Sequence, residues 1–394
     1  MLIRDIIYLI NAVLIDLKTS KPLEGVRVLD LTHAHAGPIC TLYMAGLGAE
    51  IIKVEPPWGE MVRFFPPLIK GASPYFAFLD RCKKGVTLDV KNPRGKAMFE
   101  ELVRKSDVVI ENFSPGTMDD LGFGWDKLEK LNPKVIYVSI SGFGHTGPWR
   151  DRRSFDPIAQ ASSGYMWLMK RTVNPDGPPY VGPEAIADTI PGFTALIGIL
   201  SALYQRQSTG HGARIDIAQL DSMLAVQQSF SFWNLAGISF EEAIMSAGPA
   251  VHGLYRANDD YVMFSVPAGR ITDWFRELIG VEELTRENIG EWVSERKVAE
   301  VVEILAKKGI PVAKINDLDE AQANEQAIAR GMFVRVNDPI RGEHTEPGFP
   351  IKFSGTGDLS TPSPTLGEHN VEIYSRLLGL TEEEIEELRN NGVI

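Results

Sequence analysis

Two sets of residues in the 394-residue sequence have types and positions that suit chemistry. The first is the pair His33 and His35, which directly follow the short apolar run VRVLDL. If that run is a strand of an open α/β sheet, the histidines lie at its carboxyl end, where such sheets bind ligands. A histidine can equally be a plain core or surface residue, so ligand contact and a structural role both stay open.

The second candidate is Asp188, in the string EAIADTIPG, where a Gly/Pro-rich region meets an apolar helix pattern. An aspartate at such a place can cap the helix N-terminus. A carboxylate beside turns and apolar walls can instead be an acid, base or nucleophile, because partial desolvation raises its reactivity. Periodicity does not decide between these two interpretations.

Other motifs are weaker or missing. GFGHTG (142–147) matches the glycine spacing of a dinucleotide site, but Pro148 and a charged run (149–153) follow where a helix should begin. These glycines more simply let a loop pass close to a ligand or another backbone. The sequence contains no G-x-S-x-G, P-loop or H-E-x-x-H motif, so serine hydrolase, nucleotide triphosphatase and zinc protease functions have no support.

The composition is that of a globular protein with two or three domains. The formal net charge is −12, from 40 Lys and Arg against 52 Asp and Glu, which argues against a nucleic-acid partner. Cys40 and Cys82 show no metal-ligand spacing, so we expect neither a metal site nor a disulfide framework, and we expect a cytoplasmic location.

The N-terminal stretch Met1–Leu17 is apolar but is interrupted by Asp5 and Asp16. It is too short and too charged to span a bilayer, and no cleavage site follows, so neither a membrane anchor nor a signal peptide is expected. The spacing of its apolar residues predicts a helix that packs on this protein or on a second subunit.

Alternating strand and helix patterns would position the candidate residues. Short apolar runs separated by helical patterns predict an α/β fold with an open, doubly wound, parallel sheet. The expected strands are 26–31, 49–55, 85–90, 107–112 and 134–140, with helices over 38–48, 92–105 and 125–131 between them.

The rest of the chain is less regular. Residues 147–184 are dense in Gly, Pro and charge, which predicts a long excursion of loops. A strongly apolar helix is expected over 189–207, followed by a strand and another long helix. Beyond residue 240 a hairpin and three helical patterns predict a second, smaller domain, and a helix with an acidic first turn is expected over 382–391.

Several separated blocks together resemble the class III CoA-transferase family, which contains formyl-CoA and carnitine CoA-transferases and the α-methylacyl-CoA racemases. The similarity begins at about residue 22 and covers nearly the whole remaining chain. The blocks are, in order, GVRVLDLTHAHAGPICTLYMAGLGAEIIKVEPPWGE, KKGVTLDVKNPRGK, DVVIENFSPGTMDDLGFGWDKL, SISGFGHTGPWRDRRSFDPIAQASSG, EAIADTIPGFTALIGILSAL, TGHGARIDIAQLDSML, HGLY and LGEHN.

The resemblance implies a Rossmann-like large domain built from both ends of the chain, a smaller α+β domain between them, and an interlocked homodimer. The large domain would comprise 22–225 and 338–394, with the small domain over 240–330. The implied substrates are an acyl-CoA and a free carboxylic or dicarboxylic acid, such as succinate or a short branched acid, and no metal is implied.

The resemblance also implies a mechanism, in which the family's nucleophilic aspartate falls on Asp188. Its carboxylate would attack the acyl-CoA thioester to form a mixed anhydride, and released CoA thiolate would convert that anhydride to an aspartyl-CoA thioester. An acceptor acid would then take the CoA through a second anhydride. Backbone N–H groups of the His35-Ala36-Gly37 turn would stabilise the oxyanions.

His35 stands where formyl-CoA transferases have a glutamine that touches the reacting acyl group, so a polar role is kept but its hydrogen bonding differs. This difference places formyl transfer itself in question. The positions that match the family's CoA contacts are Ala36, Leu88, Asp89, Val90, Lys91, Asn112, Phe113, Ser114 and Arg153. Of these, Lys91 and Arg153 suit phosphate groups.

Two positions depart from the family pattern, because Pro56 and Asp120 stand where some members place arginines on the CoA phosphates. The basic residues expected to substitute are Lys53, Arg63, Lys83 and Lys84. Each of them can equally be an ordinary solvated charge.

Phe155 separates the transferase from the racemase. Racemases of the superfamily pair the aspartate with a histidine that precedes a second aspartate, and here the matching pair is Phe155-Asp156. Phenylalanine takes no proton, and only His145 and His252 are nearby candidates to replace that base. The sequence therefore favours an intermolecular CoA-transferase. A racemase or intramolecular CoA-transferase, and a non-catalytic or nicotinamide-type Rossmann protein, are the alternatives.

The glycine-rich flap of formyl-CoA transferases also has no counterpart beyond Val266-Pro267-Ala268-Gly269. A shorter cover would suit a bulkier acyl group than formyl.

Overall fold

The computed structural model describes residues 21–246, 252–266, 269–353 and 359–394. The chain divides into two compact units. The larger unit combines the N-terminal part of the chain through Val226 with Arg330–Ile394, and the smaller unit is Gln227–Ala329. The helix expected at Met1–Leu17 lies outside the described residues.

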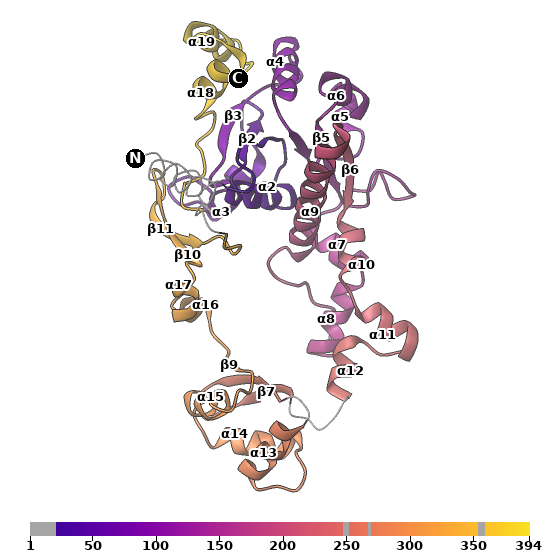
Figure 1. Ribbon diagram of the computed structural model, residues 1–394, viewed down its shortest axis with the longest axis vertical. Coiled ribbons are helices and arrows are strands. Elements are labelled where there is room, and N and C mark those ends of the chain that lie inside the picture. The colour runs from indigo at the N-terminus through magenta and orange to yellow at the C-terminus, as the bar shows by residue number, and fades with distance from the viewer. Residues whose placement is uncertain (1–20, 247–251, 267–268, 354–358) are drawn as a thin grey trace, which may run out of the picture. The chain divides into compact units, whose positions relative to one another are not determined.

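The larger unit is built on a six-stranded parallel sheet with the order β3-β2-β1-β4-β5-β6 (Figure 1). The prediction of an α/β fold with an open parallel sheet is therefore confirmed. The direction of strand succession reverses between β1 and β4, which is the switch point where sheets of this order bind ligands. The strands are β1 (Arg27–Asp30), β2 (Glu50–Glu55), β3 (Lys84–Thr87), β4 (Val108–Glu111), β5 (Ile136–Ser141) and β6 (Ala213–Ala218).

Helices cover both faces of this sheet because successive strand residues point to opposite sides. Val28 of β1 packs in one buried cluster with α2 (Ala36–Gly46) and α9 (Ile186–Thr209). The next residue, Leu29, packs in the other cluster with α4 (Pro93–Arg104), α18 (Asn370–Leu378) and α19 (Glu382–Asn390). The C-terminal segment thus completes the core of the larger unit. Its remaining elements are η1 (Met61–Phe64), α3 (Pro74–Asp80), α5 (Thr117–Asp120), α6 (Trp125–Leu131), α10 (Gln219–Ala225) and the antiparallel pair β10 (Phe333–Asp338) and β11 (Gly342–Pro347).

The structure differs from the sequence prediction in two stretches. The expected loop region 147–184 contains two helices, α7 (Asp156–Ser162) and α8 (Tyr165–Val173), and Gly164 with φ of 81° separates them. Proline at the start of α7 favours helix initiation, although the stretch has no apolar periodicity long enough to reveal it. The long helix expected after β6 is broken at 226–228, between α10 and α11 (Ser229–Ala236).

The smaller unit contains the expected hairpin, β7 (His252–Arg256) and β8 (Tyr261–Ser265), extended by the antiparallel strand β9 (Val312–Lys314). Its core joins Tyr255, Phe264, Phe275 and Trp292. The helices are α11, α12 (Phe240–Ser246), α13 (Arg270–Ile279), α14 (Arg286–Ser294), α15 (Val298–Ala306), α16 (Leu318–Gln322) and α17 (Glu325–Ala329).

Candidate active site

The switch point of the sheet is closed by a reciprocal pair of hydrogen bonds between the turns after β1 and β4. Asn112 Oδ1 accepts the His33 N–H at 2.7 Å, and Asn112 Nδ2 donates to the His33 carbonyl at 2.7 Å. One side chain therefore fixes the backbone that leads from β1 into α2.

That backbone turns sharply at Ala34, whose φ of 62° lies in the left-handed region, and His35 is the N-cap residue of α2. A side chain at Gly37 would place its Cβ 2.2 Å from Thr32 Cγ2, so only glycine fits there. The first N–H groups of a helix have no acceptor within the helix. The start of α2 thus offers the Ala36 and Gly37 N–H groups at the carboxyl edge of the sheet.

Asp188 lies in the first turn of α9, and the residue at the N-cap position is Ala185. The N-cap interpretation of Asp188 is therefore wrong. Glu184 and Ala185 have φ of 62° and 45°, and such left-handed conformations of non-glycine residues persist only where surrounding structure enforces them. A strained turn thus presents the carboxylate.

The surroundings of Asp188 raise the pKa of its carboxyl group into the neutral range. Burial and the neighbouring negative charge of Asp156 raise its pKa to about 7, although a hydrogen bond from Gln219 Nε2 to Asp188 Oδ1 acts in the opposite direction. A half-buried carboxylate with few hydrogen bonds is more nucleophilic than a fully solvated one, because less solvation is lost when it attacks.

Asp156 holds the turn before Asp188 in place. Its Oδ1 accepts the Ala187 N–H at 2.7 Å, and its Oδ2 accepts a hydrogen bond from Gln160 Nε2 at 2.7 Å. Gln160 in turn accepts the Gly182 N–H at 2.7 Å. Both ends of the strained turn are therefore tied to α7.

Gly192, one helical turn beyond Asp188, lets α9 lie directly on α2. A Cβ there would come 2.3 Å from Ile39 Cγ2 and 2.6 Å from the Ala36 carbonyl oxygen. Residues four apart share a helix face, so this close approach brings Asp188 to the N-terminal end of α2. By length and composition α9 could also cross a membrane, the only such helix in the described part of the chain, but it packs against α2 and β5 within the larger unit.

His35 connects the two helices through its ring. Its Nδ1 lies 3.1 Å from Tyr75 Oη, and its Nε2 lies 2.9 Å from Thr189 Oγ1, on the residue after Asp188. Burial lowers the pKa of His35 to about 4, so the imidazole is neutral at pH 7. One ring nitrogen then donates a hydrogen bond and the other accepts one.

These parts meet in one cleft of about 310 Å³. Most of the site residues expected from the sequence line it, namely His35, Ala36, Asn112, Phe113, Ser114, Arg153 and Asp188. The segment Leu88, Asp89, Val90 and Lys91 does not. Leu88 and Asp89 bond by their N–H groups to the carbonyls of Glu55 and Val393, and Lys91 is exposed in the loop after β3. The structure thus places the expected CoA contacts in two separate groups.

Gln219 is a lining residue that the sequence prediction missed. It is the first residue of α10, directly after the carboxyl end of β6. The rule that ligands bind at strand carboxyl ends could have identified it from ARIDIAQLDSML, because it follows the predicted strand in the way that His33 follows β1.

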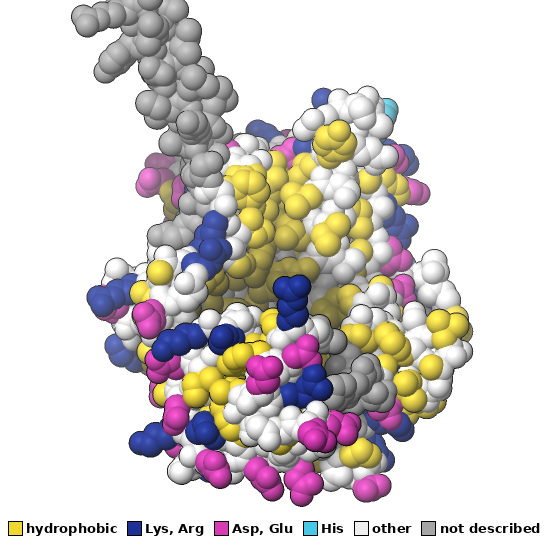
Figure 2. Space-filling view, turned by 60° about the horizontal axis from the view of Figure 1, so that its bottom comes forward, with side chains coloured by type: hydrophobic (Ala, Val, Ile, Leu, Met, Phe, Trp, Pro, Cys, Tyr) yellow, Lys and Arg dark blue, Asp and Glu magenta, His cyan; other side chains and the backbone are white. Residues whose placement is uncertain are grey.

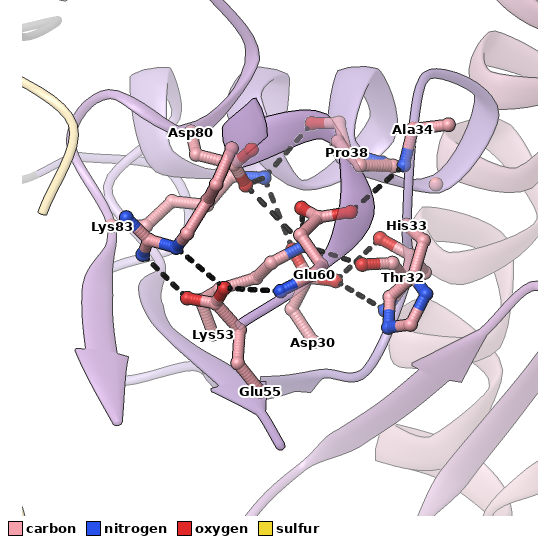
Figure 3. Close-up of polar contacts among 12 residues, drawn as sticks. Asp30, Thr32, His33, Ala34, Pro38, Lys53, Glu55, Glu60, Asp80 and Lys83 are labelled. Carbon is pink, nitrogen blue, oxygen red and sulfur yellow. Dashed lines mark hydrogen bonds and ion pairs between the residues drawn. The ribbon is translucent and has the colours of Figure 1, made fainter. Parts of the chain in front are cut away.

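Two of the lysines expected to hold CoA phosphates are buried instead. They belong to an ionic cluster formed by Asp30, Lys53, Glu55, Glu60, Arg63, Asp80 and Lys83 (Figure 3). Lys53 and Lys83 have side chains with no exposed surface, and Lys83 Nζ lies 2.8 Å from Asp80 and 3.1 Å from Asp30. The expectation that these two lysines replace the family arginines is therefore wrong, because paired and inaccessible ammonium groups cannot reach a phosphate.

Arg63 and Lys84 are also engaged. Arg63 pairs with Glu55 at 2.5 Å, and Lys84 pairs with Glu50 and Glu372. Around the cleft, Arg152 and Arg153 are the exposed cations among the lining residues that the structure describes. In the described ranges, no group of three or more His, Cys, Asp or Glu side chains is placed to hold a metal ion.

The family model described as CoA-transferase family III matches residues 23–370. The chain belongs to CoA-transferase family III. It is accordingly an enzyme of the acyl-CoA:carboxylate CoA-transferase class, as two formyl-CoA:oxalate CoA-transferases among its relatives also indicate. Those of Streptomyces avermitilis and Streptomyces coelicolor are each 37% identical to this chain, covering 95% of it and 100% of the relative.

Two solved structures have a similar fold. A CAIB/BAIF family protein from Brucella suis is 30% identical with a TM-score of 0.79, covering 91% of this chain and 100% of that one. A hypothetical protein from Mycobacterium tuberculosis is 26% identical with a TM-score of 0.76, covering 89% of this chain and 98% of that one.

Proposed function

We propose that this family III CoA-transferase moves CoA from an acyl-CoA thioester to a free carboxylic acid through covalent intermediates on Asp188. One observation carries the proposal. A half-buried carboxylate with a pKa raised to about 7 lies, behind a strained turn, in the same cleft as the N-terminal end of α2.

The transfer consists of four acyl exchanges. An Asp188 oxygen attacks the thioester carbonyl, the C–S bond breaks, and CoA thiolate leaves an acyl-aspartyl anhydride. The thiolate attacks the Asp188 carbonyl carbon and releases the donor acid as its carboxylate. The acceptor carboxylate then attacks this aspartyl-CoA thioester and releases the thiolate. Attack of the thiolate on the acceptor acyl carbon forms the new acyl-CoA and restores the Asp188 carboxylate.

No step of this reaction transfers a proton, which agrees with a neutral His35 in the cleft. Each step does develop negative charge on a carbonyl oxygen. The Ala36 and Gly37 N–H groups, at the positive end of the α2 dipole, are placed to stabilise that charge. His35 lines the same cleft, and its two ring nitrogens are held by the Tyr75 and Thr189 hydroxyl groups.

The exposed Arg152 and Arg153 at the cleft support binding of the anionic parts of CoA, and we assign Asn112, Phe113 and Ser114 to the same substrate. The Leu88–Lys91 loop would contact a more distant part of the CoA molecule. Because relatives are named formyl-CoA:oxalate CoA-transferases, we propose small acids as the donor and acceptor of this enzyme. The replacement of the family glutamine by His35 favours a donor other than formyl-CoA.

Phe155 lines the cleft and provides no second base, which argues against racemisation. His145, considered as a substitute, lines a different pocket with Glu111 and Arg214, and His252 belongs to the smaller unit. His145 therefore does not supply a second base in this cleft.

We also propose that the enzyme is a cytoplasmic homodimer. The larger unit exposes several large apolar side chains around η1, with Trp58, Met61 and Phe64 each more than half exposed. Figure 2 shows hydrophobic side chains among the charged ones on the surface of the molecule. Large exposed apolar patches commonly mark subunit interfaces.

The test mixes the purified enzyme with a panel of acyl-CoAs and free acids in heavy water and follows the products by mass spectrometry. Formyl-CoA with oxalate is one pair, and succinate and short branched acids extend the panel. New acyl-CoA pairings without deuterium at the α-carbon are expected. Asp188→Ala should abolish these pairings while CoA binding is kept, and turnover by that variant, or deuterium uptake without new pairings, would contradict the proposal.

A further inference from the structure

The ionic cluster lies beside the turn that begins α2 (Figure 3). We propose that Glu60 is a positioning residue for the transfer, which holds the Ala34 turn so that the N–H groups at the start of α2 face the cleft. This inference rests on the proposed function, because it assigns a purpose to the N-terminal end of α2.

Glu60 and Lys53 form hydrogen bonds with the backbone of the turn on both sides of His33. Glu60 Oε2 accepts the Ala34 N–H at 3.1 Å, and Glu60 Oε1 lies 2.9 Å from Lys53 Nζ. Lys53 Nζ also donates to the Thr32 carbonyl. A single buried ion pair therefore contacts the carbonyl before His33 and the N–H after it.

The turn needs such support because of its backbone conformation. Ala34 has φ of 62°, which an L-residue adopts only when its neighbours enforce it. Asn112 fixes His33 from the side of β4, and Glu60 fixes the next residue from the side of β2. Ala34 directly precedes His35, the N-cap of α2, so an error in its φ changes the direction of the following N–H groups.

Glu60 is itself held firmly enough to act as a clamp. It is 1% exposed, and its own N–H donates to Glu55 Oε1 at 3.1 Å. Glu60 is also the N-cap residue of η1, whose first residue, Met61, lines the cleft. One residue thus links the η1 wall of the cleft to the start of α2.

The cluster offers a matched control in Asp80. Asp80 belongs to the same cluster, but it pairs with Lys53 and Lys83 and not with the backbone of the Ala34 turn. The cluster has four carboxylates and three cations, so neutralising either carboxylate balances its formal charge. Both Glu60→Gln and Asp80→Asn are therefore expected to fold.

The experiment compares these two variants at pH 8, since burial raises the pKa of Glu60 to about 7 against the opposing charge of Lys53. Glu60→Gln is expected to lower kcat at least tenfold while KM for the acyl-CoA changes by less than threefold. Hydrogen exchange in a peptide spanning 31–42 should be faster in this variant. Asp80→Asn should keep kcat within twofold and leave exchange in that peptide unchanged.

A Glu60→Gln protein with wild-type kcat and exchange would overturn the inference. An equal loss in Asp80→Asn would also overturn it, because the effect would then belong to the charge of the cluster. If Glu60→Gln does not fold, Glu60→Met is the second variant, and wild-type turnover there has the same meaning. Asp188→Ala separates the proposed function from the role of Glu60. Turnover by Asp188→Ala would refute the covalent mechanism, whereas the hydrogen-exchange comparison would still test whether Glu60 holds the Ala34 turn.

Discussion

Replacing Gly192 by alanine tests whether the contact between α9 and α2 sets the position of Asp188. The added Cβ would lie 2.6 Å from the Ala36 carbonyl oxygen, and ordinary contact begins at 3.4 Å. The helices must therefore separate by about 0.8 Å, the difference between these two distances, because a backbone carbonyl cannot rotate away as a side chain can. Asp188 lies on the same face one turn earlier and would move with α9.

The expected magnitude follows from two opposing terms. Overpacking of this kind costs about 1–3 kcal/mol. Alanine in place of glycine within a helix stabilises the folded state by about 1 kcal/mol. The protein should therefore remain folded, with a free energy of unfolding lower by at most about 2 kcal/mol. A displacement of about 1 Å at the reacting groups lowers the rate by roughly 100-fold, and this loss should appear in kcat.

The assay measures kcat of CoA exchange together with the unfolding free energy from urea denaturation. Gly198→Ala is the matched control on the same helix, because its Cβ would meet only the flexible Ile215 side chain, at 3.3 Å and 3.5 Å. That variant should keep the wild-type kcat, and its free energy of unfolding should rise by up to about 1 kcal/mol. Wild-type kcat in Gly192→Ala, or an equal loss in Gly198→Ala, would refute the positioning argument.

Three further variants and the pH profile of the wild type test the charge and hydrogen bonding of the site. Asp188→Asn should be inactive yet more stable than the wild type at pH 8. The carboxyl pKa raised from 3.8 to about 7 stabilises the folded wild type below pH 4, and this contribution is lost as pH rises through 7. Urea denaturation at pH 5 and pH 8 measures the difference in stability, and equal wild-type and variant stability at pH 8 would contradict the raised pKa. In the wild type, kcat should rise with pH through about 7 as Asp188 ionises, and a profile flat from pH 5 to 8 would argue against Asp188 as nucleophile. His35→Gln should keep kcat within about tenfold because an amide also offers one donor and one acceptor to Tyr75 and Thr189, whereas His35→Ala should lose more. Equal losses in the two would indicate a role specific to the imidazole ring.

Much of the larger unit could be predicted because its signals are local. The strands β1, β2, β4 and β5 are short apolar runs, and α4 begins at an asparagine cap followed by proline, so their positions follow from a few neighbouring residues. The helices α7 and α8 were missed because Gly164 separates two pieces that are each too short to show a period. Strand order and the partners of side chains involve residues far apart, which no window of sequence contains.

Contiguous residues are enough to predict the α/β class and the alternation of strands and helices. Motif strings of contiguous residues also carry the resemblance to the class III CoA-transferases. The sequence also indicated Asp188 and His35 as candidates, but not their surroundings. The folded protein is needed to show that Asp188 lies inside the first turn of α9 beside Gln219, and that Lys53 and Lys83 are buried. Burial and charge pairing depend on contacts such as Lys83 with Asp30, which lie 53 residues apart in the chain and meet only after the sheet has formed.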